Sequence, residues 1–123
     1  MATFSRLEEI QAWQKARQVT RMIYQVTAGG EFARDYGLRD QIRRASVSVM
    51  ANIAEGFGRR SDKEFANFLN VSHGSVSEVQ SHLYVALDLS YVEQSVFNEL
   101  YSLLEEISRM TLALAQRLRA SKI

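Results

Sequence analysis

The stretch from residue 37 to residue 55 constrains the fold most, because its polar residues recur at helical spacing among apolar ones. At about 100° per residue, five of these polar side chains share one sector of a helix, roughly 80° wide. Nearly every other position between Ala45 and Ala54 is apolar or small, whereas a surface helix has one apolar stripe and a broad polar face. We therefore expect a helix that is buried nearly all round in a helical assembly, with one polar seam. The seam consists of Gln41, Arg44, Ser48, Asn52 and Glu55.

Apolar residues three or four positions apart predict three further helices, over residues 7–28, 62–87 and 95–120. Ser61, with Glu64 three residues later, predicts a capping box at the start of the helix at 62–87. The helix at 95–120 has the heptad spacing that is typical of near-parallel helix packing. The first helix is expected to turn one polar face to solvent. That face consists of Gln14, Arg17, Gln18, Arg21 and Gln25.

Residues in the connections predict where helices end and where the chain turns. Gly29–Gly30 predicts the end of the first helix, and Phe32 and Tyr36 are predicted to anchor the link that follows. The segment Gly56–Arg60 predicts a turn that uses the backbone freedom of its glycines. The chain contains no proline, which inside a helix would cost about 3 kcal/mol. We expect residues 1–123 to form one antiparallel, up-down-up-down four-helix bundle.

Composition limits the class of protein. A chain of 123 residues with 46% hydrophobic and 24% charged residues is typical of one folded domain. It has no cysteine, which excludes disulfides and thiolate chemistry and favours the cytoplasm. We see neither the apolar region of a signal peptide nor an apolar run of about 20 residues. A soluble cytoplasmic protein without a membrane segment is expected.

Antiparallel pairing of the second and third predicted helices brings Ser75, Glu78 and His82 to the level of the polar seam. Because a buried arginine needs a partner, we predict a contact between Arg44 and Glu78. Ser48 has no evident base one helical turn away, so the seam with Ser75 and Glu78 is interpreted as structural, not catalytic. Neither a phosphate-loop motif nor the Glu-x-x-His motif of di-iron bundles is present. We therefore expect no catalytic, cofactor-binding or metal-binding residue and no small-molecule substrate.

The formal net charge is only +1, but the charges are unevenly distributed. Residues 34–63 include seven basic and four acidic residues, whereas residues 64–108 include seven acidic ones and no lysine or arginine. Such asymmetry can steer a charged partner to one region; alternatively, acidic and basic helices simply neighbour one another, within or between subunits. Exposed basic residues can hold nucleic-acid phosphates. The candidate nucleic-acid-binding residues are Arg39, Arg43, Arg59, Arg60 and Lys63.

The segment QIRRASVSVMANIAEGFGRRSDKEFANFLNVSHGSVSEVQSHL, at residues 41–83, resembles the family of 23S rRNA intervening-sequence proteins. The resemblance extends to LEEIQAWQKARQ before this segment and to LDLSYVE after it. One departure is Met50, where many relatives carry proline. The resemblance implies an antiparallel four-helix bundle that assembles as a ring-shaped homopentamer. The family includes the accessory variability determinants of diversity-generating retroelements, which are basic partners of a reverse transcriptase and nucleic acid; the near-neutral charge here departs from that pattern.

Two hypotheses follow for the function. The first is a non-enzymatic, homopentameric protein that binds RNA, DNA or a nucleic-acid-handling protein such as a reverse transcriptase. A ring would repeat a modest basic cluster and gain avidity. The alternative is a purely structural or protein-binding oligomer that uses the acidic surface of its last two helices.

Overall fold

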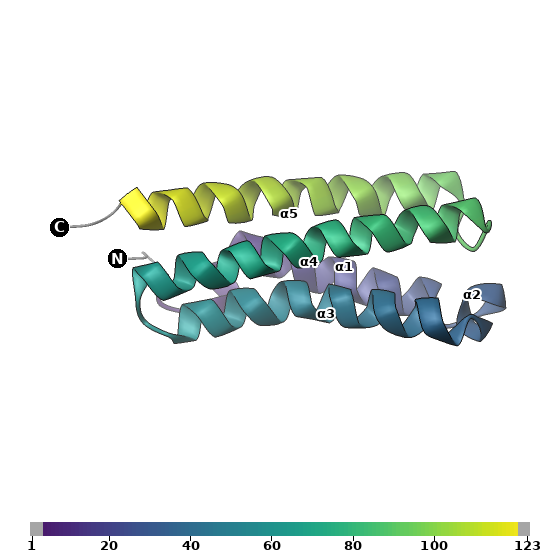
Figure 1. Ribbon diagram of the computed structural model, residues 1–123, viewed down its shortest axis with the longest axis horizontal. Coiled ribbons are helices and arrows are strands. Elements are labelled where there is room, and N and C mark those ends of the chain that lie inside the picture. Colours follow the sequence, from purple (N-terminus) through teal and green to yellow (C-terminus); the bar gives the residue numbers. More distant parts are fainter. Residues whose placement is uncertain (1–3, 121–123) are drawn as a thin grey trace.

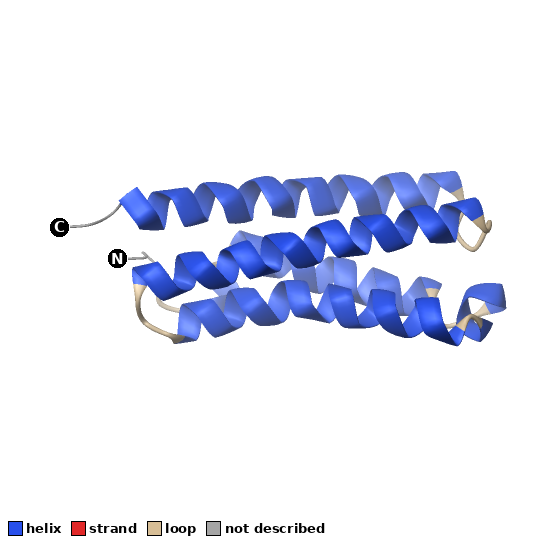
Figure 2. Cartoon of the chain, in the orientation of Figure 1, coloured by secondary structure: helices blue, strands red, loops and turns tan. Residues whose placement is uncertain are grey.

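The computed structural model describes residues 4–120, and every secondary-structure element in this part of the chain is a helix. The four long helices lie side by side and alternate in direction, so that the first and last described residues lie at one end of the bundle (Figures 1 and 2). Each long helix packs against two others, in the closed order α1, α3, α4, α5. This confirms the all-α prediction. The elements are η1 (Leu7–Glu9), α1 (Gln11–Val26), α2 (Gly30–Arg34), α3 (Tyr36–Gly58), α4 (Asp62–Asp88) and α5 (Gln94–Ala120).

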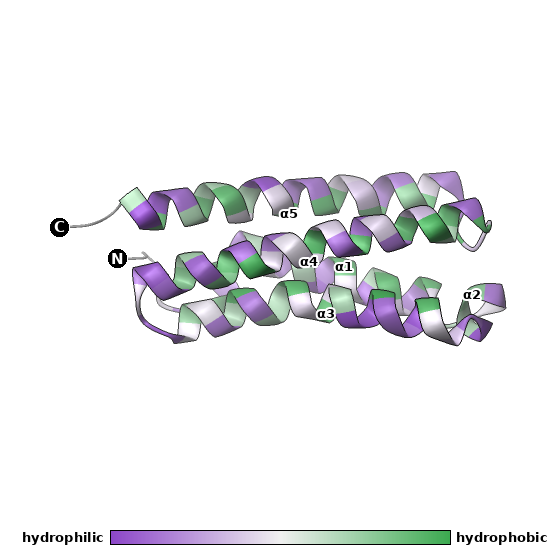
Figure 3. Ribbon diagram, in the orientation of Figure 1, coloured by the Kyte–Doolittle hydropathy of each residue, from purple (hydrophilic) through white to green (hydrophobic). Residues whose placement is uncertain are grey.

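The core lies between the four long helices. Figure 3 shows hydrophobic bands that recur along each of them, as amphipathic helices in a bundle require. The heptad residues of α5 point inward as predicted, and Leu100, Leu104 and Ile107 are fully buried. The polar face predicted for α1 is exposed along its length. The other fully buried large side chains include Ile10, Ile23, Ile42, Ile53, Leu69 and Leu83.

The first predicted helix differs most from the observed one. Ile10 has an extended backbone, so the chain forms the short helix η1 before α1 begins at Gln11. The helix α1 ends at Val26, before the two glycines, and Gly30 with its φ of +65° starts the short helix α2, which the sequence did not predict. Only five residues long, α2 is too short to show the repeated apolar spacing that identifies a helix.

Tyr91 joins the two connections at one end of the bundle. Phe32 of α2 is buried and stacks on its ring, with the ring centroids 5.2 Å apart, which confirms Phe32 as an anchor. The Tyr91 hydroxyl donates a hydrogen bond of 2.9 Å to Asp35 Oδ2, and this bond raises the pKa of Tyr91 above its ordinary value. Asp35 also caps α3 by accepting from the Leu38 amide. Tyr36 was predicted as a second anchor, but this is wrong: it is 64% exposed, and its ring lies under the Arg39 guanidinium at 4.9 Å.

The predicted turn at residues 56–60 is wrong in its first half, because α3 continues through Gly58. Gly56 is buried in the helix, where an added Cβ would lie 2.8 Å from Phe68 Cβ and 3.2 Å from the Phe65 carbonyl oxygen. The glycine therefore allows α3 and α4 to approach closely. The chain reverses at Arg60, whose φ is +62°. The Ser61 hydroxyl then accepts from the Glu64 amide at 3.3 Å, which confirms the N-cap half of the predicted capping box, whereas the Glu64 carboxylate pairs with Arg59 and does not complete the box.

Candidate functional site

The polar seam lies where α3 and α4 meet, and its centre is a hydrogen-bonded cluster. Ser48 Oγ and Ser75 Oγ are 2.8 Å apart. The Asn52 amide donates to the Ser48 carbonyl oxygen at 2.8 Å and to Ser48 Oγ at 3.0 Å. One turn away, Ser72 donates to the Val49 carbonyl oxygen at 2.7 Å. These bonds tie the two helices together in the register expected from antiparallel pairing, and each short polar side chain is satisfied by another polar group.

The ends of the seam are not buried, and this corrects the prediction of a helix enclosed on all sides. Gln41, Arg44, Glu55 and Glu78 are all exposed. The physical reason is that the seam follows the outer edge of the α3–α4 contact. Short side chains at this edge reach inward, as that of Ser75 does, whereas long charged ones extend to water.

The predicted pairing of Arg44 with Glu78 is not formed inside the chain. The two side chains line one shallow depression of about 290 Å³, together with Gln41, Ala45 and Ser48. Within residues 4–120, however, no ion pair joins them. Glu78 Oε2 instead lies 3.5 Å from His82 Nε2, a buried nitrogen that has no hydrogen-bond partner in the described part of the chain.

The five candidate nucleic-acid-binding residues fall into two groups at opposite ends of α3. From position 39 to position 59 the helix rises about 30 Å, so one group cannot reinforce the other within a single chain. Arg43 donates to the Thr27 hydroxyl at 2.7 Å and lies 4.5 Å above the Tyr24 ring. Arg39 donates to Asp40 and to the Ala33 carbonyl oxygen. Both arginines of this group therefore position neighbouring elements as well as contributing charge.

At the other end of α3, the basic cluster is weaker than the sequence indicates. Arg59 forms ion pairs with Glu55 at 3.0 Å and Glu64 at 3.3 Å, and it lies 5.0 Å above the Phe68 ring. Two carboxylates thus offset its charge. Arg60 and Lys63 remain exposed beside it.

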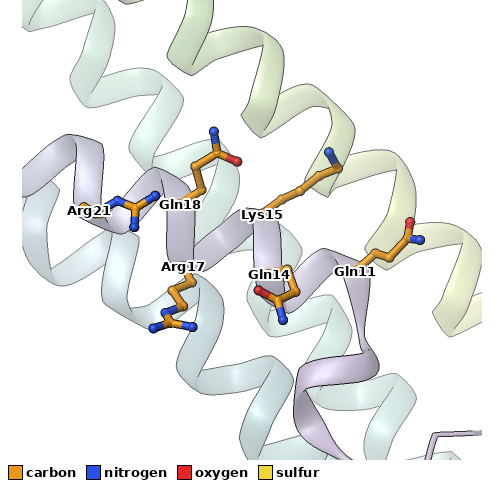
Figure 4. A pocket seen from close by; sticks show the side chains of 6 residues that line it. All are labelled: Gln11, Gln14, Lys15, Arg17, Gln18 and Arg21. Carbon is orange, nitrogen blue, oxygen red and sulfur yellow. The ribbon is translucent and has the colours of Figure 1, made fainter.

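The structure adds a basic surface on α1 that the sequence reasoning treated only as a face toward solvent. Between Glu9 and Glu31 the chain has three basic residues and no acidic one. This charge pattern could have indicated the basic surface from the sequence alone. Figure 4 shows the six side chains of this surface, which line an open depression of about 540 Å³. They are Gln11, Gln14, Lys15, Arg17, Gln18 and Arg21.

The described residues contain no group of three or more His, Asp or Glu side chains placed to hold a metal ion. Over the same residues, no helix is long and apolar enough to cross a membrane. The surface of the bundle provides hydrogen-bonding groups, charged side chains and aromatic rings.

The fold and the seam define the class of protein, which is an all-α bundle of long antiparallel helices, two of which are joined by a small polar cluster. Within that class, the chain belongs to the family of 23S rRNA-intervening sequence proteins, which matches residues 8–113. It is similar in fold to the crystal structure of a protein of unknown function from the S23 ribosomal protein family of Bacteroides thetaiotaomicron VPI-5482. The two are 19% identical, with a TM-score of 0.77 over 85% of this chain and 98% of the other. No curated protein matches the chain.

Proposed function

We propose that this protein is a non-enzymatic, ring-forming homopentamer that binds RNA or DNA through its basic side. The observation that carries the proposal is the separation of charge in the fold. The helix α1 has three basic residues and no acidic one, whereas α4 has four acidic residues and one basic residue. Because α1 and α4 each pack against α3 and α5, they occupy opposite corners of the bundle. A phosphate backbone is thus attracted to one side and repelled from the other.

Self-association is supported by exposed apolar side chains on α4 beside the seam. Val71 and Val85 are 52% and 42% exposed, and their spacing of seven residues from Glu78 places all three on one stripe of α4. A neighbouring copy on this stripe would cover both valines and allow Arg44 to pair with the partner subunit's Glu78. An interface between two different faces of one protein generates a closed ring when its rotation closes. Five copies is the number that the resemblance to the family implies.

The absence of enzymatic activity is also part of the proposal. Ser48 and Asn52 have the chemistry of catalytic residues, but their polar atoms bond to one another and to Ser75. The hydrogen-bond partners of Ser48 Oγ are therefore a hydroxyl and an amide, and neither is a base that would activate it. Such a cluster serves packing, not turnover.

Two measurements test the proposal. Light scattering of the purified protein is expected to give a mass of about 70 kDa, five times the 14.0 kDa of one chain. Fluorescence anisotropy with labelled RNA and single-stranded DNA is expected to show binding that weakens steeply as salt is added. A stable 14.0 kDa monomer would refute the ring, and no binding at low salt would refute the nucleic-acid role.

A second candidate is a structural or protein-binding oligomer, in line with the acidic side of the bundle. Tyr84, Val85 and Leu89 are exposed near the end of α4, close in sequence to Asp88. Apolar residues beside a carboxylate suit a basic protein partner. This function would leave nucleic-acid binding absent at every salt concentration while the oligomer persists.

A further inference from the structure

Arginine side chains stack on aromatic rings along the edge where α1 meets α3. The Arg17 guanidinium lies 5.8 Å from the centre of the Trp13 ring, and Arg43 lies 4.5 Å from that of Tyr24. We propose that this edge binds a single-stranded nucleic acid, with bases stacked on the rings and phosphates held by the arginines. The inference rests on the proposed nucleic-acid function and assigns it to a different site from the turn between α3 and α4.

Contacts between α1 and α3 place these pairs on the same edge of the bundle. Thr20 donates to the Ser46 carbonyl oxygen at 3.2 Å, and Arg43 reaches from α3 to the Thr27 hydroxyl. In Figure 4, Arg17 points to the opposite side of α1 from Lys15, and Lys15 faces Glu106 of α5 at 3.8 Å. Arg17 therefore lies on the α3 side of α1, as Tyr24 does.

The edge offers a row of stacking surfaces with space beside them. Trp13 and Tyr24 are eleven residues apart on one helix, which corresponds to a rise of about 16 Å. Tyr24 is 42% exposed and lines a depression of about 360 Å³ with Asp40, Arg43, Arg44 and Val47. The Asp40 carboxylate is the acidic group in this depression, and Arg39 pairs with it at 3.0 Å. The local field therefore remains favourable to phosphate.

A single strand suits this edge better than a duplex. Bases of unpaired strands stack on aromatic rings and on guanidinium planes, whereas the bases of a duplex are already stacked on one another. Stacking on a ring also holds an arginine in place before the ligand arrives, so less side-chain entropy is lost on binding. Arg17 and Arg43 each offer a guanidinium plane for stacking, and each is held against an aromatic ring. Arg21 adds an exposed charge one turn before Tyr24.

The test uses the full-length protein and fluorescence anisotropy with labelled oligo-uridine RNA, oligo-thymidine DNA and a duplex. The double variant Arg17→Gln/Arg21→Gln removes two phosphate contacts, so the slope of log affinity against log salt is expected to fall by about 1.4 for single strands. Tyr24→Leu keeps an apolar side chain but removes the ring, and it is expected to weaken binding about five- to tenfold. Tyr24→Phe keeps the ring and is expected to bind as the wild type does. The matched control Arg60→Gln/Lys63→Gln removes two charges from the α3–α4 turn and is expected to keep most of the affinity.

The outcomes separate this inference from the proposed function. If the wild type binds no strand at low salt, the proposed function itself fails. If the wild type binds but the α1 variants match it while Arg60→Gln/Lys63→Gln loses affinity, only the assignment to this edge is overturned. Tighter binding of the duplex than of both single strands would overturn the choice of single-stranded ligand. Binding of either single strand that Tyr24→Leu weakens and Tyr24→Phe keeps supports the inference, and the stronger of the two strands identifies RNA or DNA as the ligand.

Discussion

Replacing Gly56 with alanine tests the close contact between α3 and α4 most sharply. The added Cβ would lie 2.8 Å from Phe68 Cβ, 3.0 Å from a Phe65 ring carbon and 3.2 Å from the Phe65 carbonyl oxygen. Two of these three atoms are fixed to the backbone of α4, so relief requires the helices to move apart. Overpacking of this kind costs about 1–3 kcal/mol, and the better helix propensity of alanine returns about 0.5–1 kcal/mol. We expect Gly56→Ala to lower the free energy of unfolding by about 1–2 kcal/mol.

Thermal and urea unfolding, followed by circular dichroism at one protein concentration, measure this effect. For a chain of 123 residues, unfolding entropy of about 2.1 cal/mol/K per residue converts the loss into a fall in Tm of about 4–8 °C. Gly58→Ala is the matched control, because its Cβ would meet no atom within 4 Å. The control is expected to be neutral or stabilising by about 0.5 kcal/mol. Equal stability of the Gly56→Ala protein and the control would refute the close-packing account.

Three further perturbations have expected results. Asp35→Ala removes the α3 cap and the acceptor of the Tyr91 hydroxyl; urea unfolding is expected to show a loss of about 1–2 kcal/mol, and an unchanged midpoint would contradict the role of Asp35. Because the hydrogen bond raises the pKa of Tyr91, its stabilisation is fully present below pH about 10 and is lost as pH rises through the folded-state pKa. Tyr91→Phe should flatten this alkaline decline in denaturation measured against pH; an equally steep decline would exclude Tyr91 as its source. Gly74 lies in the middle of α4, where an added Cβ would meet no atom within 4 Å in the chain, so Gly74→Ala should stabilise the helix by about 0.5–1 kcal/mol; a urea midpoint that does not rise would contradict this.

The sequence predicted those parts of the fold that depend on neighbours along the helix. The heptad residues of α5 are buried, and Ser61 caps α4, because spacing and capping are local properties. The sequence also predicted that Ser75 and Glu78 lie at the level of the polar seam, although Ser75 lies beside Ser48 and not beside Arg44 as expected. Antiparallel pairing of helices joined by a short turn leaves little choice of register.

The sequence could not predict features that depend on how close two helices come. Gly56 was assigned to a turn, whereas its lack of a side chain serves the contact with Phe65 and Phe68. Arg59 was counted as free charge, but folding places it between Glu55 and Glu64. Phe65, Phe68 and Glu64 lie on the next helix, where the spacing along α3 carries no information. Glu55 lies one helical turn before Arg59, so this pair could have been predicted from the sequence.

The exposure of Arg44 and Glu78 was also not predictable from the sequence. Helical spacing placed both correctly on the α3–α4 contact, since they line the same depression. It did not show whether that depression is buried or open to solvent. The structure shows that both long side chains lie on the outer edge of the seam and are exposed. Their pairing between subunits remains a prediction of the proposed ring.

The most direct test of the account is the affinity of the native protein for a labelled single strand of RNA, measured as salt is raised. We expect binding at low salt and a linear fall of log affinity against log salt, with each phosphate contact contributing about 0.7 to the slope. Absence of binding at the lowest salt, or an affinity that does not change with salt, would contradict it.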